Sequence, residues 1–207
     1  MELKTFPVGE HLANCYLVIA QGGKVGVLID PGDQADDIMR FVGALNVTHI
    51  LVTHGHPDHV GALEDVRKAL EAPVGIHPAD AETFDLPLDI PLEEGVSLEV
   101  CNDRLEVVHI PGHTPGSVAL RLVEDDQYRR AIVGDAIFPG GPGYTETPKD
   151  LETSLASLAK TVFTWAGETI LYPGHGSSTT VGTERAAFEA FYAGSRPPDL
   201  CGDVTWG

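Results

Sequence analysis

Residues 50–59 of the chain read Ile50-Leu51-Val52-Thr53-His54-Gly55-His56-Pro57-Asp58-His59. The last six positions hold three imidazoles and one carboxylate, and they follow an apolar run that is typical of a buried strand. Because α/β proteins bind ligands at the carboxyl ends of such strands, this stretch is predicted to supply part of the ligand set of a metal site. We expect the strand to cover residues 47–53.

Three single residues further along the chain complete the candidate ligand set. Each lies where an apolar run meets glycine: His113 in residues 111–117, Asp135 in residues 133–135 and His175 in residues 173–176. Imidazole and carboxylate together suit divalent metals, and the full set exceeds what one tetrahedral ion needs. We therefore expect two adjacent metal ions, zinc in the first place, with iron or manganese as alternatives. The candidate ligands are His54, His56, Asp58, His59, His113, Asp135 and His175.

Strand and helix patterns alternate along the rest of the chain, which predicts one α/β domain over residues 1–207. A hairpin is expected first, and its two strands are residues 14–19 and 24–30. Further strands are expected over residues 74–76, 98–100, 105–110, 117–123, 130–133 and 169–172. Helices are expected over residues 34–45, from residue 60 or 61 to 70, from a cap at Asp150 through Val162, and over residues 184–192. Residues 139–143 read as a Gly/Pro-rich loop beside Asp135, and residues 199–207 as irregular.

Composition excludes several classes of function. The formal net charge of −18 opposes binding to nucleic acid, because such binding depends on basic side chains that neutralise phosphates. The chain has no export signal and no apolar run of membrane-spanning length, so we expect a soluble, cytoplasmic protein. Its three cysteines are too few and scattered for a disulfide framework. The expected partner is a small-molecule substrate.

The histidine cluster, followed in order by Gly112-His113-Thr114-Pro115-Gly116, Gly134-Asp135 and Pro173-Gly174-His175-Gly176, resembles the metallo-β-lactamase superfamily. The resemblance covers most of the chain and implies an αββα sandwich with the metals at one edge. It implies that His54, His56 and His113 hold the first metal. Asp58, His59 and His175 would hold the second, and Asp135 would bridge both.

Within that superfamily the chain resembles most the short bacterial branch of hydroxyacylglutathione hydrolases (glyoxalase II). The segments that carry this resemblance are residues 14–18 (NCYLV), 29–32 (IDPG) and 179–184 (TTVGTE). It implies a binuclear hydrolase that cleaves hydroxyacylglutathione-like thioesters by attack of a metal-bridging hydroxide. Asp58 would orient that hydroxide or relay a proton.

Some positions depart from related patterns and leave alternatives open. Class B β-lactamases place cysteine or serine where Asp135 stands, and the lactonases place tyrosine where Phe138 stands. Short glyoxalases have Gly-Arg-Ser/Thr-Asp where this chain has residues 143–146 (GYTE), and only Arg185 and Arg196 are basic after His175. The main alternative is a persulfide dioxygenase-like enzyme with one iron at His54, His113 and Asp135. A lactone hydrolase and a noncatalytic metal-binding protein are further alternatives.

Residues outside the ligand set receive plainer interpretations. Asp30 either forms hydrogen bonds around the ligands or belongs to an ordinary Asp-Pro-Gly turn. His49, His77 and His109 are expected to be structural, and His11 and Tyr144 to be surface residues or part of the pocket wall. Cys15 is expected to be a buried strand residue and not a nucleophile.

Overall fold

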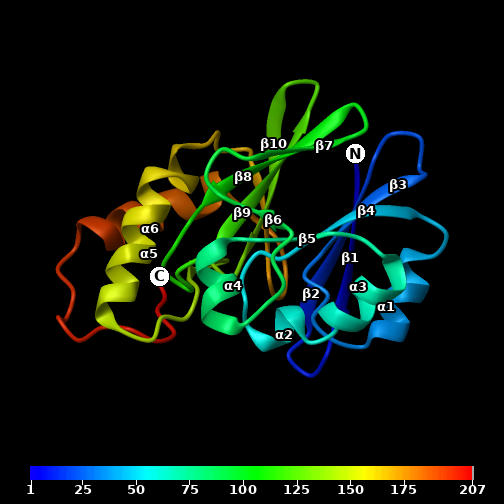
Figure 1. Ribbon diagram of the computed structural model, residues 1–207. Helices are drawn as coiled ribbons and strands as arrows, with labels where there is room; N and C mark the ends of the chain where they lie inside the picture. The colour runs from blue at the N-terminus through cyan, green and yellow to red at the C-terminus, as the bar shows by residue number, and fades with distance from the viewer. Residues whose placement is uncertain (207) are drawn as a thin grey trace.

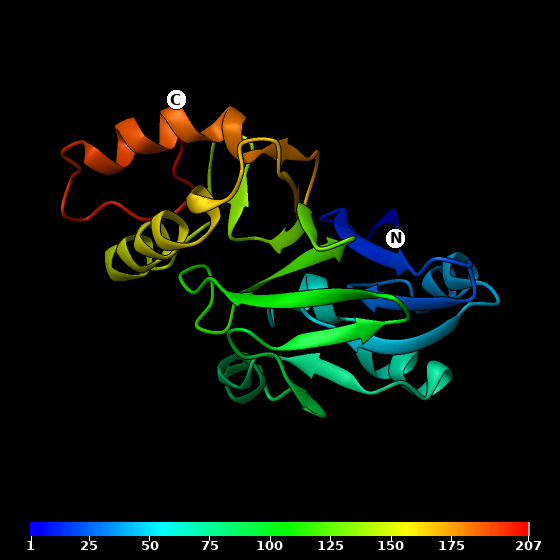
Figure 2. The ribbon, with the colours of Figure 1, turned by 90° about the horizontal axis from the view of Figure 1, so that it is seen from above.

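The structure, a computed structural model, describes residues 1–206 and stacks its elements in four layers, helix, sheet, sheet and helix (Figure 1). In Figure 2 the two large sheets lie face to face, with α1 to α4 outside one of them and α5 and α6 outside the other. This arrangement confirms the predicted αββα sandwich. The helices are α1 (Ala35–Val42), α2 (Pro57–Val60), α3 (Leu63–Leu70), α4 (Pro78–Phe84), α5 (Pro148–Lys160), the short 3₁₀ helix η1 (Val162–Thr164) and α6 (Val181–Ala193).

The first sheet has six strands in the order β1-β2-β3-β4-β5-β6. Its first three strands run antiparallel, and the pairs from β3 to β6 are parallel. The strands are β1 (Glu2–Val8), β2 (Ala13–Ile19), β3 (Val25–Ile29), β4 (Asn46–Leu51), β5 (Val74–Ile76) and β6 (Ile90–Pro91).

The second sheet also has six strands, in the order β14-β13-β10-β9-β8-β7. Only the pair β10 and β13 is parallel. The strands are β7 (Ser97–Val100), β8 (Asp103–His109), β9 (Val118–Glu124), β10 (Gln127–Gly134), β13 (Ile170–Pro173) and β14 (Thr179–Thr180), and a separate small hairpin joins β11 (Ile137–Phe138) to β12 (Gly141–Pro142).

Apolar side chains fill the space between the sheets and the space on each outer face. In β4, Leu51 points into the space between the sheets, whereas Ile50 packs against the helices of the first outer layer. Successive side chains of a strand point to opposite faces, so a strand buried on both faces needs a continuous apolar run. This is why residues 50–52 contain no polar side chain.

Most predicted elements are confirmed, with local corrections. The cap of α5 is Thr147, and Asp150 is its partner in a capping box. Asp58 and His59 lie on the short helix α2, which precedes the helix expected from residue 60 or 61, because Pro57 begins a helical turn. Strand β1 and helix α4 were not predicted, because β1 is a largely exposed edge strand and α4 is short.

The remaining boundaries shift by a few residues. Helix α3 begins at Leu63, and α6 begins at Val181 behind a Thr180 cap. The loop predicted beside Asp135 contains the β11–β12 hairpin. Residues 199–206 have no helix or extended strand, as expected, and Gly207 lies outside the described residues.

The two sheets meet at the edge where the candidate ligands lie. The N–H of Val118 in the second sheet donates to the carbonyl of Thr53 after β4, at 2.9 Å. The N–H of Asn14 in the first sheet donates to the carbonyl of Gly174 after β13, at 2.7 Å. These bonds fix the strand ends that precede the ligands. Within residues 1–206 no helix is both long and apolar enough to cross a membrane.

Candidate metal centre

The structure brings all seven candidate ligands together at one edge of the sandwich. They form three overlapping groups, and the ligand atoms of each group lie within 4.8 Å of one another. The groups are His54, His56 and His113; His54, His59 and Asp135; and Asp58, His59 and His175. Residues that are more than a hundred positions apart in the sequence thus share one centre.

The first group consists of three imidazoles around a common point. The ring of His113 lies 4.7 Å from that of His54 and 4.5 Å from that of His56, between centroids. The rings are nearly perpendicular, with interplanar angles of 76° and 88°. The rings therefore do not stack face to face, and each offers a nitrogen atom that lies within 4.8 Å of the ligand atoms of the other two.

The group of Asp58, His59 and His175, called the second ligand group below, combines two imidazoles with a carboxylate. His175 Nε2 lies 3.2 Å from Asp58 Oδ2 and 3.3 Å from His59 Nε2. His59 Nε2 lies 3.9 Å from the same oxygen of Asp58. This group shares no residue with the first group.

Asp135 lies between the two groups. Its Oδ1 is 3.5 Å from His59 Nε2, and its Oδ2 is 3.7 Å from His113 Nε2 and 3.5 Å from His175 Nε2. One carboxylate therefore reaches imidazoles of both groups.

Three buried atoms of this centre have no hydrogen-bond partner within the described residues. They are His54 Nε2, His113 Nε2 and Asp135 Oδ1. A buried polar atom without a partner costs about 1–3 kcal/mol, so native proteins rarely keep several together. A divalent cation would satisfy all three atoms, and their chemistry is that of a metal-binding site. The residues present therefore fit the expected metal.

Hydrogen bonds at Nδ1 orient four of the imidazoles. His113 Nδ1 donates to the carbonyl of Tyr144 at 2.8 Å, and His175 Nδ1 donates to that of His11 at 2.9 Å. Since a carbonyl only accepts, each Nδ1 carries a proton, and Nε2 is the atom that can bind a cation once it is deprotonated. His11 and Tyr144 thus act through their backbone carbonyls.

Asp30 orients the imidazoles of His59 and, through Thr53, of His54. Its Oδ2 accepts hydrogen bonds from His59 Nδ1 at 3.1 Å and from Thr53 Oγ1 at 2.7 Å. The Thr53 hydroxyl, which donates to Asp30, accepts from His54 Nδ1 at 3.1 Å. Of the two interpretations left open for Asp30, the structure supports hydrogen bonding around the ligands.

Burial and neighbouring charges shift the pKa values of the candidate ligands in different directions. Burial, followed by repulsion from the neighbouring imidazoles, lowers the pKa of His54 well below its usual value. The contact with Asp135 raises the pKa of His175 to about 9. Burial alone would raise the pKa of Asp135, but the contact with His175 and the charges of His59 and His113 lower it. A neutral His54 and an ionised Asp135 are the forms that bind a cation.

Gly174 makes this packing possible. A Cβ atom at this position would lie 1.9 Å from Asp135 Oδ1 and 2.7 Å from His59 Cε1. Any side chain would displace the carboxylate that lies between the two groups, so the glycine before His175 is a steric requirement of the centre.

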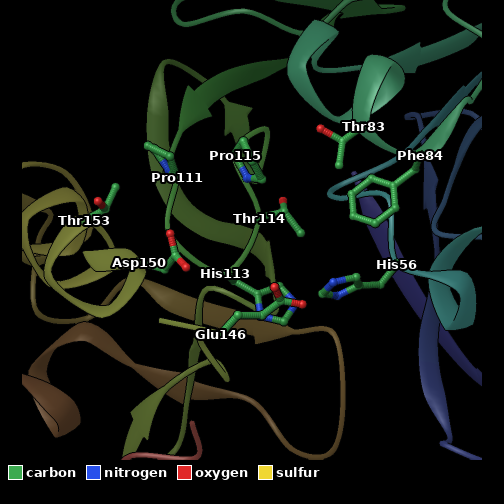
Figure 3. A pocket seen from close by; sticks show the side chains of 11 residues that line it. His56, Thr83, Phe84, Pro111, His113, Thr114, Pro115, Glu146, Asp150 and Thr153 are labelled. Atoms are coloured by element: carbon green, nitrogen blue, oxygen red, sulfur yellow. The ribbon is translucent and has the colours of Figure 1, made fainter. Parts of the chain in front are cut away.

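A cavity of about 510 Å³ opens beside His56 and His113 (Figure 3). Its apolar walls include Phe84, Pro111 and Pro115. Its polar residues are Thr83, Thr114, Glu146, Asp150 and Thr153. Among residues 1–206, its lining contains no lysine or arginine. An apolar cavity next to convergent polar groups is the usual form of a substrate pocket.

Sequence reasoning missed several residues around the centre. Thr53 lies between Asp30 and His54, and Asp80 of α4 contacts the loops of the first group. An acidic residue in the first turn of a helix is ordinarily solvated and favoured by the helix dipole, so Asp80 carried no signal. Phe84 lines the cavity, but a single phenylalanine at the end of a short helix forms no pattern that would indicate this role.

Comparisons with known proteins agree with this geometry. Residues 8–180 match the sequence profile of the metallo-β-lactamase superfamily. The chain is 32% identical over 206 residues to a protein of Haemophilus influenzae named hydroxyacylglutathione hydrolase GloC, covering 89% of this chain and 95% of that protein.

Two solved structures resemble the fold closely. The BLEG-1 B3 metallo-β-lactamase has a TM-score of 0.78 and 28% identity, covering 93% of this chain and 100% of that one. TTHA1623 in a di-iron-bound form has a TM-score of 0.72 and 33% identity, covering 88% and 96%.

Proposed function

The chain belongs to the metallo-β-lactamase superfamily, and from this premise we propose that it is a binuclear metal-dependent hydrolase that cleaves hydroxyacylglutathione-like thioesters. The observation that carries the proposal is the second ligand group, formed by Asp58, His59 and His175. A mononuclear centre at His54, His113 and Asp135 would use none of these three side chains as ligands, whereas a binuclear centre uses all of them. The name of the Haemophilus influenzae relative supports a thioester as the substrate.

The residues that would hold the metals divide as the ligand groups do. His54, His56 and His113 would hold one ion, Asp58, His59 and His175 the other, and Asp135 would contact both. Two such ions, when bound, activate a water molecule as the nucleophile and polarise the carbonyl of the substrate. Zinc is the metal that we propose, and the di-iron form of TTHA1623 makes iron the first alternative.

Asp58 would orient water and relay protons in this reaction. Its Oδ2 lies 3.2 Å from His175 Nε2, and its side chain is 28% exposed. It also lines a second hollow of about 400 Å³, together with His11, Asp33 and Pro57. A proton taken up at Oδ2 could therefore pass to solvent through this hollow, which shares no lining residue with the cavity beside His56 and His113.

The cavity beside His56 and His113 would hold the substrate. Its apolar walls suit an acyl group, and the two metal-ligand imidazoles form its floor, so a carbonyl placed there lies next to the first ligand group. The walls of the cavity thus position the substrate while the centre supplies the chemistry.

Three alternatives remain, and only the first of them uses fewer of these features. An oxygenase with one iron at His54, His113 and Asp135 needs none of the second group. Hydrolysis of β-lactams is the second alternative, because the fold is similar to that of the BLEG-1 B3 metallo-β-lactamase. Lactone hydrolysis would use the same two ions, but Phe138 provides no phenol to assist the carbonyl.

Metal analysis and turnover on one sample test the proposal. Protein purified without chelators is expected to hold two metals per chain and to hydrolyse S-lactoylglutathione faster than a lactone or a β-lactam. Asp135→Ala is expected to lose metal and at least about 100-fold in kcat/KM, because a ligand matters more than its outer partners. A single iron per chain with persulfide-dependent oxygen uptake would reject the proposal in favour of the oxygenase.

A further inference from the structure

Asp80 is a buried carboxylate outside the ligand set, and its contacts connect two separate loops. The residue is 0% exposed and lies in the first turn of α4. Its Oδ1 accepts a hydrogen bond from the N–H of Gly116 at 2.6 Å. Its Oδ2 accepts from the N–H of Gly55 at 2.8 Å and from Thr114 Oγ1 at 2.7 Å.

These three partners belong to the loops that carry the first ligand group. Gly55 separates His54 from His56 after strand β4 of the first sheet. Thr114 and Gly116 lie one and three positions after His113, in the loop between β8 and β9 of the second sheet. One carboxylate therefore joins the two sheets at the point where their imidazoles must converge.

His56 depends on this contact more than the other imidazoles do. Among residues 1–206 its ring makes no hydrogen bond, so its position is set by its backbone and by packing. Phe84, at the other end of α4, packs edge-on against it at 5.5 Å between centroids (Figure 3). Helix α4 thus holds the loop of His56 through Asp80 and its ring through Phe84.

Helix α4 is itself attached to the second sheet. His77, the residue before α4, stacks on His109 at the end of β8, with centroids 4.1 Å apart and an interplanar angle of 12°. His109 Nε2 lies 2.9 Å from the carbonyl of Pro115, in the loop that follows His113. The helix therefore has a defined position from which Asp80 can act.

We propose that Asp80 is a positioning residue for the first metal ion, because it holds the loops of His56 and His113 at the separation that lets the first ligand group share one cation. The inference rests on the proposed metal centre. The second ligand group has different anchors: Asp30 holds His59, and the carbonyl of His11 holds His175. Loss of Asp80 should therefore weaken one metal site and spare the other.

The test measures the affinity of each metal site in the full chain by competition with a chelator. In Asp80→Asn an amide nitrogen must face the N–H of Gly116 or of Gly55. We expect the affinity of one site to fall about 10- to 100-fold, the effect typical of a lost outer partner, and the other to stay within about threefold. At intermediate chelator concentration the variant should hold one zinc per chain where the unmodified protein holds two.

Thr114 provides a milder variant should Asp80→Asn fail to fold. Thr114→Val removes the hydroxyl that donates to Asp80, and Thr114→Ser keeps it, so only the valine variant should weaken the first site. Asp89→Asn is the matched control. Asp89 accepts from the backbone N–H of Val74 at 2.8 Å and from Arg67 at 3.0 Å, and neither partner belongs to a loop that carries a candidate ligand.

Two results would overturn the inference. One is unchanged affinity at both sites in Asp80→Asn, or in Thr114→Val where the first variant does not fold. The other is an equal loss at both sites that follows a fall in the melting temperature of chelated protein, which would make Asp80 a general structural residue. The metal content of the unmodified protein separately tests the binuclear function, and the affinity ratio between variant and parent tests Asp80 even with a single ion.

Discussion

Asp30 Oδ2 accepts a hydrogen bond from His59 Nδ1 at 3.1 Å, and both side chains are fully buried. The same oxygen accepts from Thr53 Oγ1 at 2.7 Å, and Oδ1 accepts from the N–H of Thr53 at 2.7 Å. A buried carboxylate with three donors is an acceptor that no neutral side chain reproduces. The first prediction concerns its loss.

Asp30→Asn is expected to lower the free energy of unfolding of the chelated protein by about 1–3 kcal/mol, because the amide nitrogen must face a donor. Metal affinity is expected to fall about 10- to 100-fold, since His59 loses its orienting partner. Denaturant unfolding and chelator competition measure the two effects. Asp33→Asn is the control, because Asp33 is exposed in the same loop and its substitution should change stability by less than about 0.5 kcal/mol. Equal stability of the two variants would contradict the role given to Asp30.

The pKa of His175, raised to about 9 by Asp135, predicts how metal-free protein responds to pH. A raised pKa in the folded state contributes stability that is complete below the ordinary histidine pKa of about 6.5 and is lost as pH rises through about 9. Metal binding requires the neutral ring and releases its proton, so metal affinity should rise over the same interval. Chelated protein is thus expected to lose stability between pH 6.5 and 9, while its affinity for zinc increases.

His175→Ala separates this effect from other titrations. The variant should lack the part of the stability change that comes from His175, and its chelated form should show a flatter melting profile between pH 6.5 and 9. Identical profiles for the variant and the parent would show that the pair of His175 and Asp135 does not couple to folding.

Cys15 is expected to be unreactive in the folded protein. It lies in β2 with 0% exposure, and burial, followed by the charge of Asp30, raises the pKa of its thiol far above the usual value. Because the thiolate is the reactive form, an aromatic disulfide reagent should modify the exposed Cys101 and the partly buried Cys201, and Cys15 only after unfolding. The count of modified thiols before and after adding denaturant measures this. Rapid modification of the double variant Cys101→Ser, Cys201→Ser under native conditions would show that β2 opens readily.

The sequence predicted the candidate ligand set because its chemistry is local. His54 and His56 share a strand end, and His113, Asp135 and His175 each follow an apolar run, so residue type and position along the chain were enough to indicate a centre. The layers were predicted for a similar reason, since a strand such as β4 must be apolar on both faces.

The residues that support the centre could not be predicted in this way. Asp80 receives its donors from loops of both sheets, and His175 is oriented by a carbonyl at His11, 164 positions away. Such contacts depend on the relative placement of elements, which no periodic pattern encodes. Thr147 shows the same limit on a small scale, because Thr147 and Asp150 are both good caps and only the structure places Thr147 in that role.

Glu146 is expected to affect the recognition of charged substrates. It lines the cavity with Asp150, and no lysine or arginine of the lining offsets these two carboxylates. A glutathione moiety carries two carboxylates and one ammonium group, so its net charge is repelled by an acidic wall. Glu146→Lys should therefore lower KM for S-lactoylglutathione about two- to fivefold, the range expected for an exposed charge, and leave kcat unchanged. KM for the neutral thioester S-lactoyl-N-acetylcysteamine should not change.

The matched control for this charge reversal is Glu168→Lys. Glu168 is exposed in the loop before β13 and does not line the cavity, so its substitution changes the net charge by the same amount at a distance. If repulsion is local, only the Glu146 variant shows the lower KM, and the difference shrinks at high salt because exposed charges are screened. A higher KM in Glu146→Lys would have the opposite meaning. It would place the ammonium group of glutathione against Glu146 and make this acidic wall a recognition element for the thiol part of the substrate.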